Sequence, residues 1–154
     1  MKLFTLLSSL VLLIGLGSCS KNCDISMTDT NGGDIVPDVI FYPKSGYLTS
    51  NLTEYVIDGN HPYAEYFQVS IDGSEKDTVD YSQYTVIGCP TNATCNASYD
   101  RTVTIDDVNQ TVTYKIVVNQ CKDCGANITA ENYVLVPNFP STYNVTYDVS
   151  YIEQ

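Results

Sequence analysis

Residues 101–118, RTVTIDDVNQTVTYKIVV, decide the fold that this sequence predicts. On both sides of a polar turn, apolar side chains alternate with polar ones, which is the period of a half-buried β-strand. The apolar positions share one face only if the two runs pair with Ile105 opposite Val112 and Val103 opposite Tyr114. The stretch therefore predicts an antiparallel β-hairpin of that register.

Short β-rich runs separated by turn residues recur on either side of this hairpin. They include DVIFY at 38–42, AEYFQVSID at 64–72, YTVIG at 84–88 and ENYVLVP at 131–137. Thirteen tyrosines, together with many threonines and valines, suit pleated surfaces, and helical spacing of apolar residues is missing from these runs. We therefore expect an all-β fold, a single antiparallel β-sandwich of immunoglobulin-like general layout, over residues 35–154.

The last β-rich run, TYNVTYDVSYI at 142–152, has two interpretations. Tyr143, Val145, Tyr147, Val149 and Tyr151 alternate with polar residues, so they share one face of the strand. Packing of this face into the core is the first interpretation, because tyrosine can bury its ring while its hydroxyl reaches the rim. A tyrosine platform that binds carbohydrate is the second, and it requires the row to face solvent.

The N-terminus carries the layout of a secretory signal over residues 1–18. Lys2 supplies a positive charge, an apolar stretch follows, and the small residues Gly17 and Ser18 come next. The apolar stretch is about 14 residues long, short of the roughly 20 that a membrane-spanning helix needs, so we expect no transmembrane span. Residues 19–34 are polar and aperiodic, which predicts a tether between the signal and the domain.

The end of the leader, Leu16-Gly17-Ser18-Cys19, resembles the lipobox of bacterial lipoproteins. The resemblance implies cleavage before Cys19 and acylation of that cysteine, which would anchor the chain to a membrane through lipid. The continuation SCSK at 18–21 is similar to the start of many surface lipoproteins of the Bacteroidota. It implies an extracytoplasmic location, in the outer membrane or at the cell surface. The resemblance covers only about the first 20 residues and says nothing of an activity.

A secreted eukaryotic glycoprotein is the competing interpretation of the leader. Six asparagines match the acceptor pattern for N-glycosylation, more than the two or so that we estimate for chance. These candidate sites are Asn51, Asn92, Asn96, Asn109, Asn127 and Asn144.

The six cysteines fit an exported protein with structural disulfides. Continuing the hairpin register brings Cys95 to within about one residue of the position opposite Cys121. We therefore expect bridges Cys95–Cys121 and Cys89–Cys124 at the open end of the hairpin, and a local bridge within each pair is the alternative. If Cys19 is acylated, the remaining number is odd, which leaves Cys23 as the expected free thiol or partner of an intermolecular disulfide.

Three other sites were considered and set aside. Four thiolates could bind zinc, but an oxidising compartment favours disulfides. Cys121 and Cys124 have the spacing of a thioredoxin motif without its strand-to-helix setting. The segment 29–34 offers oxygen ligands near glycines, but it lacks the complete pattern of a calcium loop. We therefore expect no metal and no cofactor.

Charge excludes one class of function and leaves three. With 18 acidic against 7 basic residues and a net charge of −11, the chain lacks the basic cluster that nucleic-acid binding needs. His61, the one histidine, precedes a proline in a turn and belongs to no recognisable catalytic motif. We expect a non-catalytic envelope module that binds a glycan or a protein, or that has a structural role. A carbohydrate-active enzyme is the alternative of another class.

Overall fold

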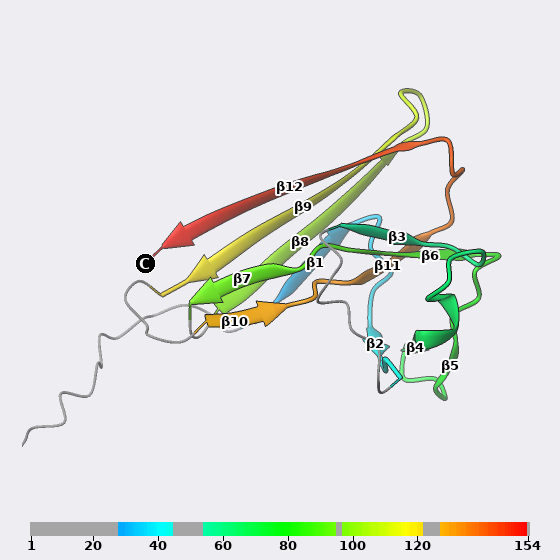
Figure 1. The fold of residues 1–154 in the computed structure, drawn as a ribbon, viewed down its shortest axis with the longest axis horizontal. Helices are drawn as coiled ribbons and strands as arrows, with labels where there is room; N and C mark the ends of the chain where they lie inside the picture. Colours follow the sequence, from blue (N-terminus) through cyan, green and yellow to red (C-terminus); the bar gives the residue numbers. More distant parts are fainter. Residues whose placement is uncertain (1–27, 45–53, 95–96, 122–126, 154) are drawn as a thin grey trace, which may run out of the picture.

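The computed structural model describes residues 28–44, 54–94, 97–121 and 127–153. Strands β1 to β12 account for nearly all regular structure in these ranges, with one short 3-10 helix, η2 (Ala64–Tyr66), and no α-helix among the described residues (Figure 1). The expected all-β class is therefore confirmed.

A long four-stranded sheet, the large sheet, contains the predicted hairpin. Its strands in spatial order are β1 (Thr30–Gly33), β8 (Ala97–Asp106), β9 (Thr111–Gln120) and β12 (Asn144–Glu153). Strands β8 and β9 are antiparallel, with Ile105 opposite Val112 and Val103 opposite Tyr114. This is the register that the alternation of apolar residues predicted.

Both outer strands of the large sheet run parallel to their neighbours. β1 is parallel to β8, and β12 is parallel to β9 over ten residue pairs. β1 lies within the range expected to be a tether, so the folded domain begins earlier than the expected boundary at residue 35. The pair Gly32-Gly33, which resembles a flexible linker in the sequence, lets β1 approach the backbone of β8 closely.

A second sheet, the middle sheet, lies under the large one. Its strands in spatial order are β11 (Val134–Pro137), β6 (Tyr84–Gly88) and β3 (Tyr55–Ile57). Strands β7 (Thr91–Thr94) and β10 (Asn127–Ala130) form a separate antiparallel pair. Because Thr91 opposes Ala130 and Ile87 opposes Val134, both pairs keep one register across a short break. They are two parts of one interrupted strand pair.

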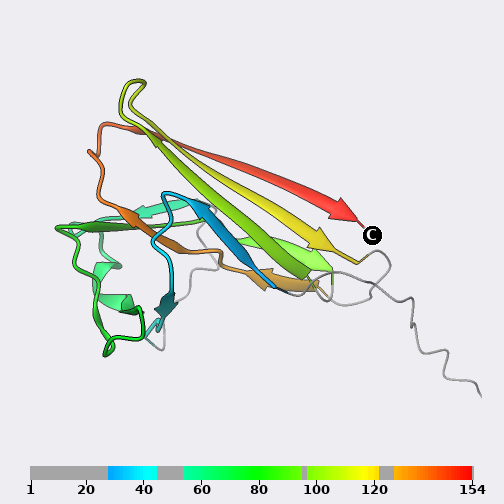
Figure 2. The ribbon, with the colours of Figure 1, turned by 180° about the vertical axis from the view of Figure 1, so that it is seen from behind.

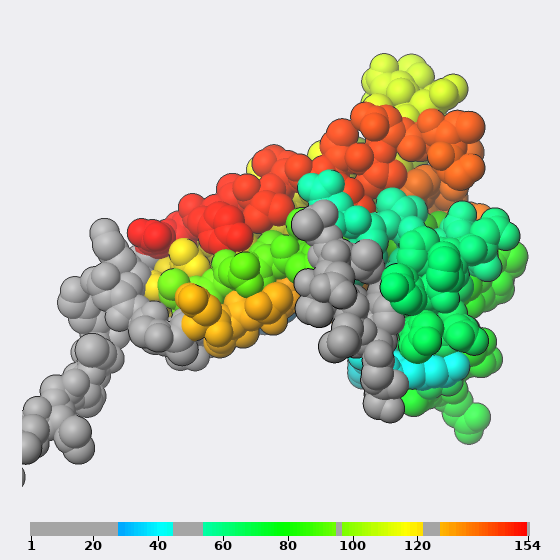
Figure 3. All heavy atoms as spheres, in the orientation of Figure 1, coloured from blue at the N-terminus to red at the C-terminus, as the bar shows by residue number. Residues whose placement is uncertain are grey.

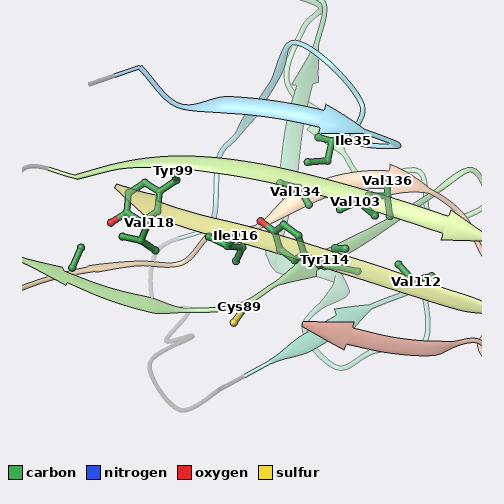
Figure 4. Packing of buried hydrophobic residues seen from close by; sticks show 12 residues of the cluster. Ile35, Cys89, Tyr99, Val103, Val112, Tyr114, Ile116, Val118, Val134 and Val136 are labelled. Atoms are coloured by element: carbon green, nitrogen blue, oxygen red, sulfur yellow. The ribbon is translucent and has the colours of Figure 1, made fainter. Parts of the chain in front are cut away.

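The middle sheet is buried on both faces. Ile87, Val134 and Val136 pack into a large apolar cluster with β8 and β9 (Figure 4). Val86 and Leu135 belong to a second cluster on the opposite face. Strands covered on both sides need consecutive apolar residues rather than alternation, which is why Val86 is followed directly by Ile87 and VLV at 134–136 is uninterrupted.

A small third sheet covers the second cluster. It consists of β2 (Val39–Phe41), β4 (Gln68–Ile71) and β5 (Asp77–Thr78), with β4 in the centre. The sheets are thus several and small, and one mixes parallel with antiparallel strands. The expected immunoglobulin-like layout of two antiparallel sheets is not what the structure shows. Period-2 patterns identify strands, but they do not specify which strands pair or in which direction.

The row on β12 packs inward for most of its length. Tyr143, Val145, Tyr147 and Val149 are partly buried against the large cluster. Only Tyr151, near the chain end, is exposed, at 48%. Core packing, the first of the two interpretations, is confirmed for this row, and the structure shows no solvent-facing tyrosine platform along it.

The folded chain begins and ends at the same end of the large sheet. Thr30 pairs with Asp100 near the start of β8, and Glu153 pairs with Gln120 at the end of β9. The turn between β8 and β9 lies at the opposite end, together with the start of β12 (Figures 1 and 2). A tether attached to β1 would therefore leave this opposite end free.

Candidate functional site

A cleft of about 840 Å³ opens at the end of the molecule opposite the chain termini. Segments far apart in the sequence form it: the turn after β3, the turn before β6, and the connection from β11 to β12. The surfaces of the first and last of these adjoin in the space-filling view (Figure 3). Its aromatic and polar lining residues are Tyr81, Phe139, Tyr143, Asp58, Asn60, His61, Ser82, Thr85, Asn138 and Ser141.

The aromatic residues of the cleft are held in place by the surrounding protein. The rings of Phe139 and Tyr143 are stacked, with centroids 6.3 Å apart and an angle of 26° between their planes. The Tyr143 hydroxyl donates a hydrogen bond of 2.9 Å to Asp107 Oδ1, and this bond, with burial, raises the pKa of Tyr143. The Tyr81 hydroxyl donates to the carbonyl of Ala64 over 3.0 Å. Both tyrosine rings are thus fixed before any ligand arrives.

His61 is oriented by backbone groups of its own turn. Its backbone N–H donates to the carbonyl oxygen of Asp58 over 3.1 Å, and its Nδ1 accepts a hydrogen bond of 3.2 Å from the backbone N–H of Tyr63. When neutral, the ring therefore carries its proton on Nε2, which can donate to a ligand. Because a backbone amide rather than a carboxylate contacts Nδ1, His61 is not arranged as the base of a Ser-His-Asp triad.

Several polar groups of the cleft have capacity left over. Asn138 accepts at Oδ1 from the Thr85 hydroxyl over 2.9 Å, which leaves its amide N–H groups available. Within the described part of the chain, the side chains of Asn60 and Ser141 make no hydrogen bond, and the Asp58 carboxylate accepts one from the Asn60 backbone over 2.9 Å. The cleft thus offers amide and hydroxyl groups and one carboxylate beside aromatic rings.

An acidic group, Asp80, is hydrogen-bonded to Ser82, which lines the cleft. Asp80 accepts hydrogen bonds from the Ser82 hydroxyl at 2.6 Å and from the Ser82 backbone at 3.0 Å. These bonds, together with one from Gln83, lower the pKa of Asp80, so it stays ionised. No lysine or arginine is among the described residues that line the cleft. The electrostatic environment therefore disfavours anionic ligands.

A second, smaller cavity of about 330 Å³ lies beside a buried polar centre that the sequence did not reveal. Arg101 forms an ion pair of 2.9 Å with Asp29 and donates from Nε to Asn132 Oδ1 over 3.0 Å, and its guanidinium lies over the ring of Tyr99, 5.1 Å from the centroid. Glu131, which also lines this cavity, has a buried Oε2 without a hydrogen-bond partner among the described residues. The one sign in the sequence was that Arg101 is the sole arginine of the chain and lies within a β-strand pattern.

The structure describes two of the predicted disulfide cysteines. Cys89 is a free thiol in the large cluster, and burial, followed by the charge of Glu54, raises its pKa. The expected Cys89–Cys124 bridge is therefore not formed. Cys121 is disulfide-bonded, and its partner lies outside the described residues. The hairpin register explains the error: β7 begins after Cys89 and carries the chain away, so Cys89 sits at the break between β6 and β7 rather than at the open end of the hairpin.

Four predicted glycosylation sites fall on described residues. Asn92, Asn109, Asn127 and Asn144 are all exposed. The side-chain nitrogen of Asn109 donates a hydrogen bond to Asp106 Oδ2 over 2.6 Å in the hairpin turn. The sites Asn51 and Asn96 lie outside the described residues, as do Cys19, Cys23, Cys95 and Cys124.

Neither a metal centre nor a membrane helix is found in the described ranges. They hold no group of three or more histidine, cysteine, aspartate or glutamate side chains placed to bind a metal ion. They also contain no helix long and apolar enough to cross a bilayer. Comparison of the chain with protein families, with curated proteins and with solved structures gave no match.

Proposed function

We propose that this protein is an exported, lipid-anchored, non-catalytic module of the cell envelope that binds a ligand at the end opposite its anchor. The arrangement of the chain supports this role best. The lipobox-like sequence ends at Cys19, shortly before Thr30, where the first described strand begins. The cleft opens at the other end of the large sheet, so an anchored domain would present it to the surroundings.

The geometry around His61 supports a binding role over the alternative of a carbohydrate-active enzyme. Glycoside hydrolysis needs two carboxyl groups on either side of the scissile bond, about 5 to 10 Å apart. The described lining of the cleft contains one carboxylate, Asp58. His61 accepts at Nδ1 from the backbone N–H of Tyr63 instead of donating to a carboxylate, which is not the arrangement of a catalytic triad.

A secreted glycoprotein is the second candidate, favoured by the exposure of Asn92, Asn109, Asn127 and Asn144. The two candidates predict different covalent chemistry. A lipoprotein begins at Cys19 and carries acyl chains, whereas the glycoprotein keeps an unmodified N-terminus and carries glycans on asparagine.

Partition in Triton X-114 and intact mass spectrometry test the proposal. The native protein should enter the detergent phase with the mass of an acylated chain starting at Cys19. The Cys19→Ala variant should remain in the aqueous phase, whereas a Cys23→Ala control should partition like the native protein. Recovery of native protein in the aqueous phase with glycan masses would replace the lipoprotein with the second candidate.

A further inference from the structure

We infer that the cleft opposite the chain termini is a binding site for a neutral saccharide of about two sugar rings. The inference names a ligand class for the proposed binding role and rests on it. The chemistry of the lining carries it: fixed aromatic rings lie beside polar groups with unused hydrogen-bonding capacity, and the described lining contains no lysine or arginine.

The electrostatics exclude acidic ligands first. Asp58 lines the cleft. Asp107 accepts a hydrogen bond from the lining residue Tyr143, and Asp80 accepts one from the lining residue Ser82. The described lining contains no lysine or arginine to pair with a phosphate, sulfate or uronic acid, and the nearby carboxylates and the net charge of −11 disfavour such ligands.

The unused polar groups exclude purely cationic or apolar ligands next. The Asn138 amide and His61 Nε2 are donors, so a ligand that buries them must supply acceptors. An ammonium group donates but cannot accept, so it would leave both donors unpaired, which is unfavourable once they are buried. A sugar hydroxyl both donates and accepts, so it can pair with these donors and with Asp58.

The rings supply the remaining contact. A pyranose presents a face of C–H bonds, and the negative face of an aromatic ring attracts such weakly positive hydrogens. Phe139 and Tyr143 are stacked on each other, and Tyr81 borders the same cleft. The hydroxyls of both tyrosines are bonded within the protein, so little side-chain entropy is lost when a ligand binds.

The cleft volume sets the size of the ligand. About 840 Å³ lies within the usual range for small-molecule sites, and it exceeds the need of a single sugar ring. The cleft is open to solvent, so a longer glycan could extend out of it.

Titration calorimetry with four neutral disaccharides provides the test: maltose, cellobiose, lactose and N,N′-diacetylchitobiose. The mature full chain is used, and circular dichroism verifies that each variant is folded. We expect at least one disaccharide to bind. Asn60→Ala and His61→Ala should each weaken that binding by tenfold or more, and Ser141→Trp, which fills the cleft from an exposed position, should abolish it.

Asn127→Ala is the matched control, because Asn127 is an exposed asparagine at the opposite end of the molecule. The affinity of this variant for the disaccharide should equal that of the native protein. Absence of binding to all four disaccharides overturns the inference, as does binding that survives Ser141→Trp. Tetramethylammonium is the cationic probe. If it binds when the disaccharides do not, and Ser141→Trp blocks its binding, the saccharide is the wrong ligand class but the cleft is still a binding site. Detergent partition reports on the anchor independently of these outcomes.

Discussion

Arg101 donates a hydrogen bond from Nε to Oδ1 of Asn132 over 3.0 Å, and this contact joins the large sheet to the break between β10 and β11. Asn132 is 5% exposed, and its backbone carbonyl accepts from the buried Tyr114 hydroxyl at 2.7 Å. Its amide nitrogen donates across the break to Thr91 Oγ1 at 2.8 Å and to the Cys89 carbonyl at 3.3 Å. One asparagine side chain thus satisfies the polar groups that the interrupted strand pair leaves open.

Removal of the Asn132 side chain should therefore destabilise the fold. Asn132→Gly removes the hydrogen-bond partner of the Arg101 Nε–H and of the Cys89 carbonyl, so the free energy of unfolding should fall by about 2–4 kcal/mol. Because Asn132 has φ of 42°, Asn132→Ala should cost about 1 kcal/mol more than the glycine variant. Urea unfolding followed by circular dichroism measures both. Equal stability of Asn132→Gly and the native protein would show that the network contributes little.

The local parts of this fold could be predicted from the sequence, and the contacts around Asn132 could not. The β8–β9 hairpin follows from the alternation of residues that are close in the chain, and its register was correct. The partners of Asn132 lie up to 43 positions away, and an asparagine in an irregular segment has no periodicity to mark it. The same limit applies to the parallel pairing of β12 with β9, since period-2 alternation is the same for parallel and antiparallel neighbours.

Alkaline pH should destabilise the protein through two buried tyrosines. Burial raises the pKa of Tyr114 and Tyr147 above the value of about 10 that they have when unfolded. The unfolded chain therefore loses these protons first, so the stability they contribute is complete below about pH 10 and is lost as the pH rises further. Unfolding in urea from about pH 8 to pH 11 should show this decline.

The Tyr147→Phe variant separates this effect from general alkaline repulsion. It removes the hydrogen bond of 2.9 Å from the Tyr147 hydroxyl to the Tyr55 carbonyl, so it should cost about 1 kcal/mol at pH 7. Its stability should then fall less steeply with pH than that of the native protein. A parallel decline in both proteins would assign the alkaline loss to other groups.

The two described cysteines should behave differently. Cys89 is buried with a raised thiol pKa, so Ellman's reagent should label it slowly in the native state and rapidly in urea. Cys89→Ala should leave the pattern of disulfides unchanged. Cys121→Ala removes a disulfide and should lower the free energy of unfolding by about 2–5 kcal/mol. A new free thiol in the Cys89→Ala variant would show that Cys89 is bridged after all.

The cleft, like the Asn132 network, could not be predicted from the sequence, because its residues are distant from one another in the chain. Its lining comes from three segments that are far apart in the sequence and lie together only in the folded protein. Among these residues, the sequence marked His61, because histidine is a common acid or base. Phe139 and Asn138 lie in a turn whose composition, NFPS at 138–141, is ordinary for a connection between strands.

A pair of glycine substitutions should show how closely β1 is packed against β8. Gly33 and Gly73 have φ of 68° and 71°, so alanine at either position costs about 1 kcal/mol in backbone strain. A Cβ at Gly33 would also overlap the carbonyl oxygen of Val103, which accepts a hydrogen bond of 2.8 Å from the Asp34 backbone. At Gly73, a Cβ has no atom within 4 Å.

Gly33→Ala should therefore lower the free energy of unfolding by at least about 1 kcal/mol more than Gly73→Ala, because β1 must move away from β8 to make room. Hydrogen exchange should locate the damage: the amide of Asp34 should lose protection in Gly33→Ala and keep it in Gly73→Ala. If the two variants are equally stable and protect Asp34 equally, β1 is not held against β8 as closely as the structure shows, and the folded domain begins nearer residue 35.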